Sequence, residues 1–162
     1  MIQSRRRAIA RAGALLVIVA GAFMAPATVA SAAGKRCPAG TEDAVIAAYA
    51  DVFSRATPLP ADQRAASLDG ADRPAVRALL DTWLASPIGA STTVTVNDVR
   101  CRSASRAGVD ADLVLAGVPL PEVMPTGRAV RENGTWKVAT STFCTRMILE
   151  DPALADAGVC AR

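Results

Sequence analysis

The 162-residue chain contains no histidine. This absence excludes Ser-His-Asp and Cys-His catalysis, metal sites with histidine ligands and an imidazole that titrates near neutral pH. The sequence also lacks the GxGxxG and GxxxxGK[ST] loops that hold nucleotide phosphates, and it lacks the CxxC pairs of zinc ribbons. No motif in the chain specifies a reaction, and we expect neither a cofactor nor a metal ion.

The first residues have the layout of a secretory signal peptide. A basic stretch with Arg5, Arg6, Arg7 and Arg11 is followed by an uncharged apolar run over residues 13–24 and by the small-x-small sequence Ala30-Ser31-Ala32. We expect a signal peptide over residues 1–32, a single domain over 33–162, and a secreted protein without a stable membrane anchor after cleavage. An uncleaved anchor over residues 12–33 is the alternative. The pattern leaves open whether export uses the general or the twin-arginine pathway.

Removal of that segment changes the charge of the chain. The whole sequence has 18 lysines and arginines against 15 aspartates and glutamates, and its first 32 residues hold four of the arginines and no acidic residue. The mature chain therefore lacks the basic excess on which non-specific nucleic-acid binding depends. We expect no nucleic-acid partner.

Two segments have apolar side chains at the spacing of an amphipathic helix. They span residues 45–53 and 76–84, and each carries five apolar residues on one stripe. The stripes are Val45, Ala48, Tyr49, Val52 and Phe53, and Val76, Leu79, Leu80, Trp83 and Leu84. A short helical turn is expected between them, over residues 62–68.

After Gly89 the apolar period changes from 3.6 to 2, which predicts strands. The expected strands are 92–101, 109–118, 127–132 and 135–143, and a short helix follows at 143–149. A β-bulge near Asn97-Asp98 accounts for a slip in the alternation, and Asn133-Gly134 is a strong hairpin signal. Helices followed by a four-stranded antiparallel meander make an α+β fold, in which the helices cover one face of a curved sheet.

Four cysteines, Cys37, Cys101, Cys144 and Cys160, are expected to form two disulfides in an exported chain. They are widely spaced and no histidine assists them, so a metal site is disfavoured. In the expected meander Cys101 and Cys144 end strands at opposite edges, farther apart than the ~7 Å between Cα atoms that a disulfide permits. The preferred pairing is Cys144–Cys160 with Cys37–Cys101. Cys37–Cys144 with Cys101–Cys160 stays open.

Several motifs occur together in the order of one group of exported proteins. They are the helix 45–53, Thr57-Pro58 with Ala61-Asp62-Gln63-Arg64, and strands that end in Gly134-Thr135-Trp136-Lys137-Val138 and Thr142-Phe143-Cys144. Over residues 45–149 the chain resembles small exported actinobacterial proteins of NTF2-like fold, in particular the C-terminal domain of mycobacterial low-molecular-weight antigens. The resemblance implies a cone, in which a curved sheet wraps around a cavity closed by helices, and it supports the Cys144–Cys160 bond. It implies no activity, because enzymes and non-enzymes share this fold.

Some isomerases of this fold carry a tyrosine on the first helix that donates a hydrogen bond to a developing oxyanion. Tyr49 is the only tyrosine and has that place, and Asp98 and Asp112 are strand acids that would serve as base and acid. These are the candidate residues of an isomerase or dehydratase. Two of them also have a structural explanation, because Tyr49 belongs to an apolar stripe and Asp98 lies at the expected bulge. The enzyme is the alternative to a non-catalytic domain.

The leading hypothesis is a secreted, non-catalytic domain of the cell envelope that binds a small apolar ligand or an envelope protein. Trp83, Trp136 and Tyr49 are the candidate residues for the apolar ligand, which would occupy the cone. A structural role is the alternative for Trp83, which would pack a helix against the sheet. The oligomeric state stays open.

An envelope protein would instead bind an exposed face of the sheet. Val114, Ala116 and Val118 are expected on the face opposite the main apolar stripe, where they would form an apolar surface. The sequence also gathers Arg100, Arg102 and Arg106 at one strand end. We expect these arginines to be solvated, and contact with an anionic surface or a lipid headgroup is the alternative.

Overall fold

The computed structural model describes residues 37–56, 58–121, 126–156 and 158–160, which all belong to the unit Ala32–Arg162. The predicted signal peptide, residues 1–32, lies outside the described residues. The helices are α1 (Thr41–Phe53), α2 (Ala61–Ala66), α3 (Pro74–Ala85), α4 (Pro87–Ser91), α5 (Thr140–Glu150) and the 3₁₀ helix η2 (Pro152–Ala155). The strands are β1 (Thr92–Ser103), β2 (Arg106–Leu115), β3 (Val118–Leu120), β4 (Gly127–Glu132) and β5 (Thr135–Val138).

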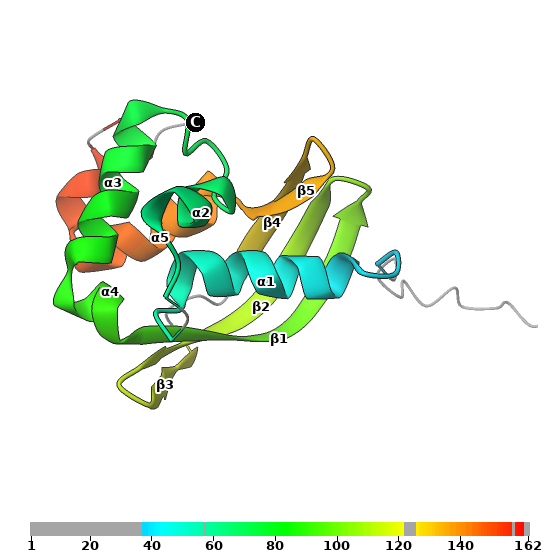
Figure 1. Cartoon of the computed structure of the whole chain (residues 1–162), viewed down its shortest axis with the longest axis horizontal. Coiled ribbons are helices and arrows are strands. Elements are labelled where there is room, and N and C mark those ends of the chain that lie inside the picture. Colours follow the sequence, from blue (N-terminus) through cyan, green and yellow to red (C-terminus); the bar gives the residue numbers. More distant parts are fainter. Residues whose placement is uncertain (1–36, 57, 122–125, 157, 161–162) are drawn as a thin grey trace, which may run out of the picture. The chain divides into compact units, whose positions relative to one another are not determined.

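The strands form one antiparallel sheet. Four of them run in the order β1-β2-β4-β5, and the short β3 pairs with the far end of β2. The sheet curls around α1, while α3, α4 and α5 gather at one end of it (Figure 1). The expected α+β class is confirmed: helices pack on a curled antiparallel half-barrel sheet, and a helix follows the last strand.

The core lies between α1 and the face of the sheet that contacts it, here called the inner face. The apolar stripe of α1 is buried as predicted, and Tyr49, Val52 and Phe53 have no exposed surface. The ring of Phe53 packs 5.9 Å from that of Tyr49 and 6.1 Å from that of Phe143 in α5, between ring centroids. The same core includes alternate residues of β2, namely Ala107, Val109, Ala111 and Leu113. Burial of a large apolar side chain contributes about 1.5–3 kcal/mol.

Local signals in the strands are confirmed. The pairing of β1 with β2 shifts between Val96 and Asp98, where the bulge is predicted. Asn133 and Gly134 have φ values of 49° and 85° and join β4 to β5 as the expected tight hairpin. Positive φ at both central residues is the geometry that an Asn-Gly turn adopts with little strain.

The second strand differs from its prediction at both ends. It begins at Arg106 and ends at Leu115, instead of covering residues 109–118. Ala116 and Gly117, with φ values of 50° and 84°, turn the chain back, so that Val118 starts β3 and pairs with Leu115. The apolar face expected from Val114, Ala116 and Val118 is therefore divided among a strand, a turn and a second strand.

The last strand is shorter than predicted. It ends at Val138, and the residues expected to complete it belong to α5, which begins at Thr140. Met147 is buried three positions after Cys144 and four after Phe143, which is helical rather than strand spacing. Their packing on the core takes precedence over the strand preference of the preceding threonines.

The structure contains both bonds of the preferred disulfide pairing. Cys37–Cys101 joins the segment before α1 to β1, and Cys144–Cys160 joins α5 to the chain after η2. The expected position of Cys144 at the end of the last strand was wrong, because this cysteine lies inside α5.

Arg64 in α2 is almost completely buried. Its guanidinium donates hydrogen bonds to the carbonyl oxygens of Asp51 and Ser54, which belong to the end of α1, and to that of Leu59. The carbonyl oxygens of Asp51 and Ser54 have no hydrogen-bond partner within α1, because they lie at its C-terminal end. The arginine of the Ala61-Asp62-Gln63-Arg64 motif therefore caps the C-terminal end of α1.

Candidate functional site

The face of the sheet turned away from α1, here called the outer face, carries charged side chains. Along β2 the buried residues of the inner face alternate with Arg106, Gly108, Asp110 and Asp112. Asp98 of β1 lies opposite Asp110, and Gly108 lies opposite Arg128 of β4. The aspartates of β1 and β2 therefore lie toward one end of the outer face, and Arg106 and Arg128 lie toward the other, where Glu132 forms an ion pair with Lys137.

Tyr49 lies inside the core and does not open onto a surface. Its hydroxyl donates a hydrogen bond of 3.1 Å to the carbonyl oxygen of Arg128, which also accepts one from the hydroxyl of Thr142. Burial raises the pKa of Tyr49 above its ordinary value, and hydrogen bonds to Thr142 and Arg128 offset this only in part. The phenol is therefore held in its protonated form.

Gly127 makes room for this tyrosine. A Cβ at Gly127 would overlap the Tyr49 hydroxyl and lie close to the carbonyl oxygen of Val109. A glycine inside a strand often marks such a close approach, so the sequence held a signal for this contact that the prediction did not use.

The structure does not bring the three predicted catalytic residues together. Asp98 forms an ion pair with Arg100, and Asp112 accepts a hydrogen bond of 3.0 Å from the side-chain amide of Asn97. Both aspartates lie on the outer face, whereas Tyr49 belongs to the core against the inner face. The sheet itself therefore separates the tyrosine from the carboxylates.

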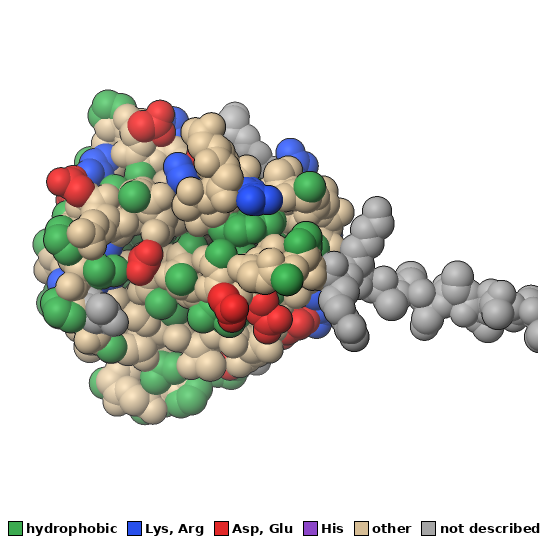
Figure 2. Space-filling model, turned by 45° about the vertical axis from the view of Figure 1, so that its right-hand side comes forward, with side chains coloured by type: hydrophobic (Ala, Val, Ile, Leu, Met, Phe, Trp, Pro, Cys, Tyr) green, Lys and Arg blue, Asp and Glu red, His purple; other side chains and the backbone are tan. Residues whose placement is uncertain are grey.

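The two tryptophans have different surroundings. Trp83 is buried, and the guanidinium of Arg146 lies 5.1 Å from the centre of its ring, a cation–π arrangement inside the helical end of the domain. Trp136 is also buried, but it lines an open hollow of about 350 Å³. This alanine hollow also contains Ala44, Ala47 and Ala48 of α1. Figure 2 shows hydrophobic side chains between α1 and the β4–β5 hairpin, with acidic side chains near the start of α1.

The interior of the curled sheet is occupied by the chain's own side chains. Tyr49, Phe53 and Phe143 have no exposed surface and form a continuous series of ring contacts there. All three predicted ligand-binding residues, Tyr49, Trp83 and Trp136, are buried in the same core cluster, and Trp136 also lines the alanine hollow.

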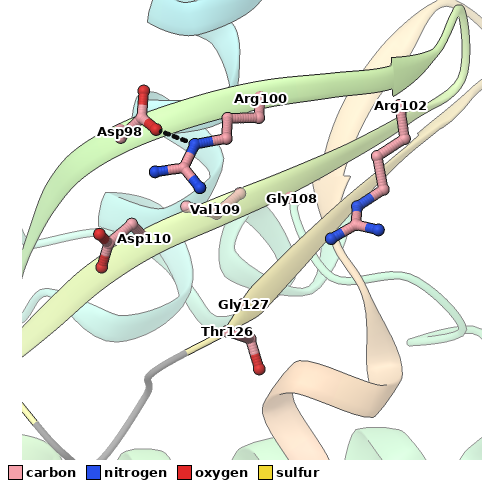
Figure 3. Close-up of a pocket in the computed structure, with 8 residues that line it drawn as sticks. All are labelled: Asp98, Arg100, Arg102, Gly108, Val109, Asp110, Thr126 and Gly127. Carbon is pink, nitrogen blue, oxygen red and sulfur yellow. Dashed lines mark hydrogen bonds and ion pairs between the residues drawn. The ribbon is translucent and has the colours of Figure 1, made fainter. Parts of the chain in front are cut away.

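Two hollows lie on the outer face. The smaller one, of about 100 Å³, is lined by Asp98, Arg100, Arg102, Gly108, Asp110 and Gly127 among others. Figure 3 shows the side chains of Asp98, Arg100 and Arg102 projecting from β1 above β2. The missing side chain of Gly108, whose Cβ would meet Arg102, leaves this space open.

The larger hollow, here called the arginine trough, has a volume of about 490 Å³. Four arginines line it, Arg73, Arg102, Arg106 and Arg128, together with Asp69 and Ser141. Of the predicted cluster of Arg100, Arg102 and Arg106, the last two line the trough, whereas Arg100 pairs with Asp98 and lines the smaller hollow. The sequence gave no indication that Arg73 and Arg128 join them. No group of three or more cysteine, aspartate or glutamate side chains among the described residues is arranged to hold a metal ion.

Residues 38–153 match the family model described as low molecular weight antigen MTB12, C-terminal domain. The chain belongs to this family. No curated protein and no solved structure matches it. The matched region of the MTB12 C-terminal domain family contains the five α-helices and five strands found among the described residues, and the arginines of the trough. Each disulfide joins one cysteine inside that region to one outside it.

Within the described residues, no helix has the length and apolar character needed to cross a membrane. The two disulfides and the antigen family are consistent with a place outside the cytoplasm, where disulfides form and persist.

Proposed function

We propose that this member of the MTB12 C-terminal domain family is a secreted, non-catalytic binding domain that binds a protein of the cell envelope through the outer face of its sheet. The signal-peptide layout of residues 1–32 and the two disulfides support a place outside the cytoplasm. The separation of Tyr49 from Asp98 and Asp112 supports a role without catalysis.

The observation that carries the proposal is the charge arrangement of the outer face. Asp98, Asp110 and Asp112 lie toward one end of it, and Arg106 and Arg128 lie toward the other. Opposite charges that are separated across a surface orient a partner of complementary charge and increase its rate of association. An envelope protein with a basic and an acidic region in the reverse order fits this face.

Photo-crosslinking in the native host tests the proposal. A photoreactive amino acid at Asp110, which is exposed at the acidic end of the outer face, should yield one discrete product in the envelope fraction. Ile46 on α1 is 38% exposed and serves as the matched control on the other side of the sheet. Identical products from both positions, or no product from position 110, would contradict the proposal.

The alanine hollow supports a second candidate, the binding of a small apolar ligand. Trp136 and three alanines form an open concave surface there, and pockets of this kind bind apolar molecules. Native mass spectrometry should detect an adduct that is lost in Ala47→Glu, which places a charge in the hollow. Ala78→Glu, on the exposed side of α3, is the control and should retain the adduct. Equal retention in both variants removes this candidate.

A further inference from the structure

The arginine trough brings together cations from distant parts of the chain. Arg73 precedes α3, Arg102 and Arg106 belong to β1 and β2, and Arg128 belongs to β4. Arg106 and Gly108 are alternate residues of β2, and Gly108 pairs with Arg128. The guanidinium of Arg102 lies over Gly108, because a Cβ built on that glycine would meet its Nε at 3.3 Å. Arg102, Arg106 and Arg128 therefore lie on one part of the outer face and line the same hollow.

Within the described part of the chain, three of these charges have no carboxylate partner. Among the described residues, no carboxylate forms an ion pair with Arg102, Arg106 or Arg128. Asp69, the acidic residue among the described residues that line the trough, accepts hydrogen bonds from the backbone and the hydroxyl of Thr140. By contrast, Arg77, Arg100 and Arg146 each have a carboxylate partner elsewhere on the domain.

One side of the trough is held in a fixed position. Arg73 donates a hydrogen bond of 3.0 Å to the hydroxyl of Thr140, the first residue of α5. The half-buried Ser141 follows it and adds a hydroxyl to the lining. The trough thus combines several guanidinium groups with a hydroxyl donor in a space large enough for a phosphorylated small molecule or headgroup.

We propose that the arginine trough binds a phosphate group that carries at least two negative charges, either on a soluble phosphorylated molecule or on a lipid headgroup. The planar guanidinium group presents paired N–H donors that match phosphate oxygens. A doubly charged phosphate would relieve the mutual repulsion of three unpaired arginines, and a singly charged anion would do so less. The proposal uses the basic end of the outer face and does not depend on the envelope protein proposed above.

Calorimetric titration with inorganic pyrophosphate at low ionic strength tests whether the arginine trough binds phosphate groups. The oxidised protein should bind one pyrophosphate saturably, and Arg128→Gln should weaken that binding about tenfold. Arg131→Gln is the matched control, because Arg131 is exposed on the same strand and its side chain donates to Gly134 outside the trough. It should leave the affinity unchanged. Equal weakening by both substitutions would mean general charge attraction and would overturn the proposal.

A double variant keeps the test independent of any one side chain. Arg106→Gln with Arg128→Gln removes two exposed side chains, and it should abolish measurable binding while the thermal midpoint without ligand is kept or raised. Binding that persists in this variant, or the absence of saturable binding in the unmodified protein, would overturn the proposal.

Vesicles distinguish the two sources of the phosphate. The protein is mixed with phosphatidylcholine vesicles that contain either phosphatidic acid, whose phosphate is a monoester, or phosphatidylglycerol, whose phosphate is a diester. Selective binding to phosphatidic acid that pyrophosphate displaces assigns the trough to a headgroup. Pyrophosphate binding without vesicle binding assigns it to a soluble molecule. Equal binding to both vesicles, with no saturable binding of pyrophosphate, would overturn the proposal.

Discussion

The hydroxyl of Tyr49 in α1 donates a hydrogen bond to the carbonyl oxygen of Arg128 in β4, 79 positions later in the chain. This bond fixes the core helix to the strand whose outer side carries the arginine trough. The residue that resembles a catalytic tyrosine therefore acts as a structural link between the core and the candidate binding surface.

The stability of the protein should fall above about pH 10. Burial raises the pKa of Tyr49 in the folded state, so above its ordinary value of about 10 the phenol ionises in the unfolded chain but stays protonated in the folded one. The Tyr49 phenol therefore makes its full contribution to the free energy of unfolding below about pH 10, and this contribution is lost as the pH rises further.

Urea unfolding between neutral pH and alkaline pH measures this decline, and the chain has only one tyrosine to produce it. Tyr49→Phe should remove the tyrosine-dependent part of the slope and lower the stability at neutral pH by about 1 kcal/mol. The same alkaline slope in both proteins would show that another group is responsible.

Gly127→Ala should destabilise the protein by about 1–3 kcal/mol, because the new Cβ would overlap the Tyr49 hydroxyl in a packed core. Gly108→Ala is the control, since its Cβ would meet chiefly the flexible side chain of Arg102. The two strand glycines should differ clearly in denaturant midpoint. Combining Gly127→Ala with Tyr49→Phe should recover part of the loss, and strict additivity would argue against this contact.

Several features of the fold were predictable because they depend on local chemistry. The stripe of α1, the bulge at Asn97-Asp98 and the Asn133-Gly134 hairpin follow from side-chain period and turn geometry, and all three are present. The end of β5 was not predictable in the same way. Thr140 and its neighbours suit a strand, and only the packing of Phe143 on Phe53 explains why they form a helix.

The candidate sites were harder to predict, because they depend on contacts between distant segments. The sequence predicted a cluster of Arg100, Arg102 and Arg106, of which only the last two line the trough. The approach of Arg73 and Arg128 requires the sheet pairing and the position of α5. Trp136 was correctly placed after a hairpin turn, yet its hollow is formed mainly by α1. Arg64 gave no signal of burial, since arginine is mostly exposed in folded proteins.

Arg64→Met should destabilise the protein by about 3 kcal/mol or more. The substitution removes the donors for the carbonyl oxygens of Asp51 and Ser54 at the end of α1 and leaves them buried without partners. Arg77→Met is a suitable comparison, because that arginine forms ion pairs at the surface with Asp62 and Asp81 and should cost less than about 1 kcal/mol. Thermal unfolding of the two variants side by side measures the difference.

The two disulfides should contribute unequally to stability. Cys37 and Cys101 are 64 positions apart, whereas Cys144 and Cys160 are 16 apart. Cross-linking a longer loop removes more entropy from the unfolded chain, which predicts losses of about 4 and about 3 kcal/mol when each pair is replaced by serine. Denaturant unfolding of the two double variants measures both losses. A larger loss from the Cys144–Cys160 pair would show that local packing around α5 outweighs loop closure.

The central claim is that this family member works outside the cytoplasm as an oxidised binding domain. The most direct test is the intact mass, under non-reducing conditions, of the protein recovered from outside the cells of its native host. The account predicts a chain that begins at Ala33 and is four hydrogens lighter than its reduced form, as two disulfides require. A chain found only inside the cell, with residues 1–32 still attached and four free thiols, would contradict it.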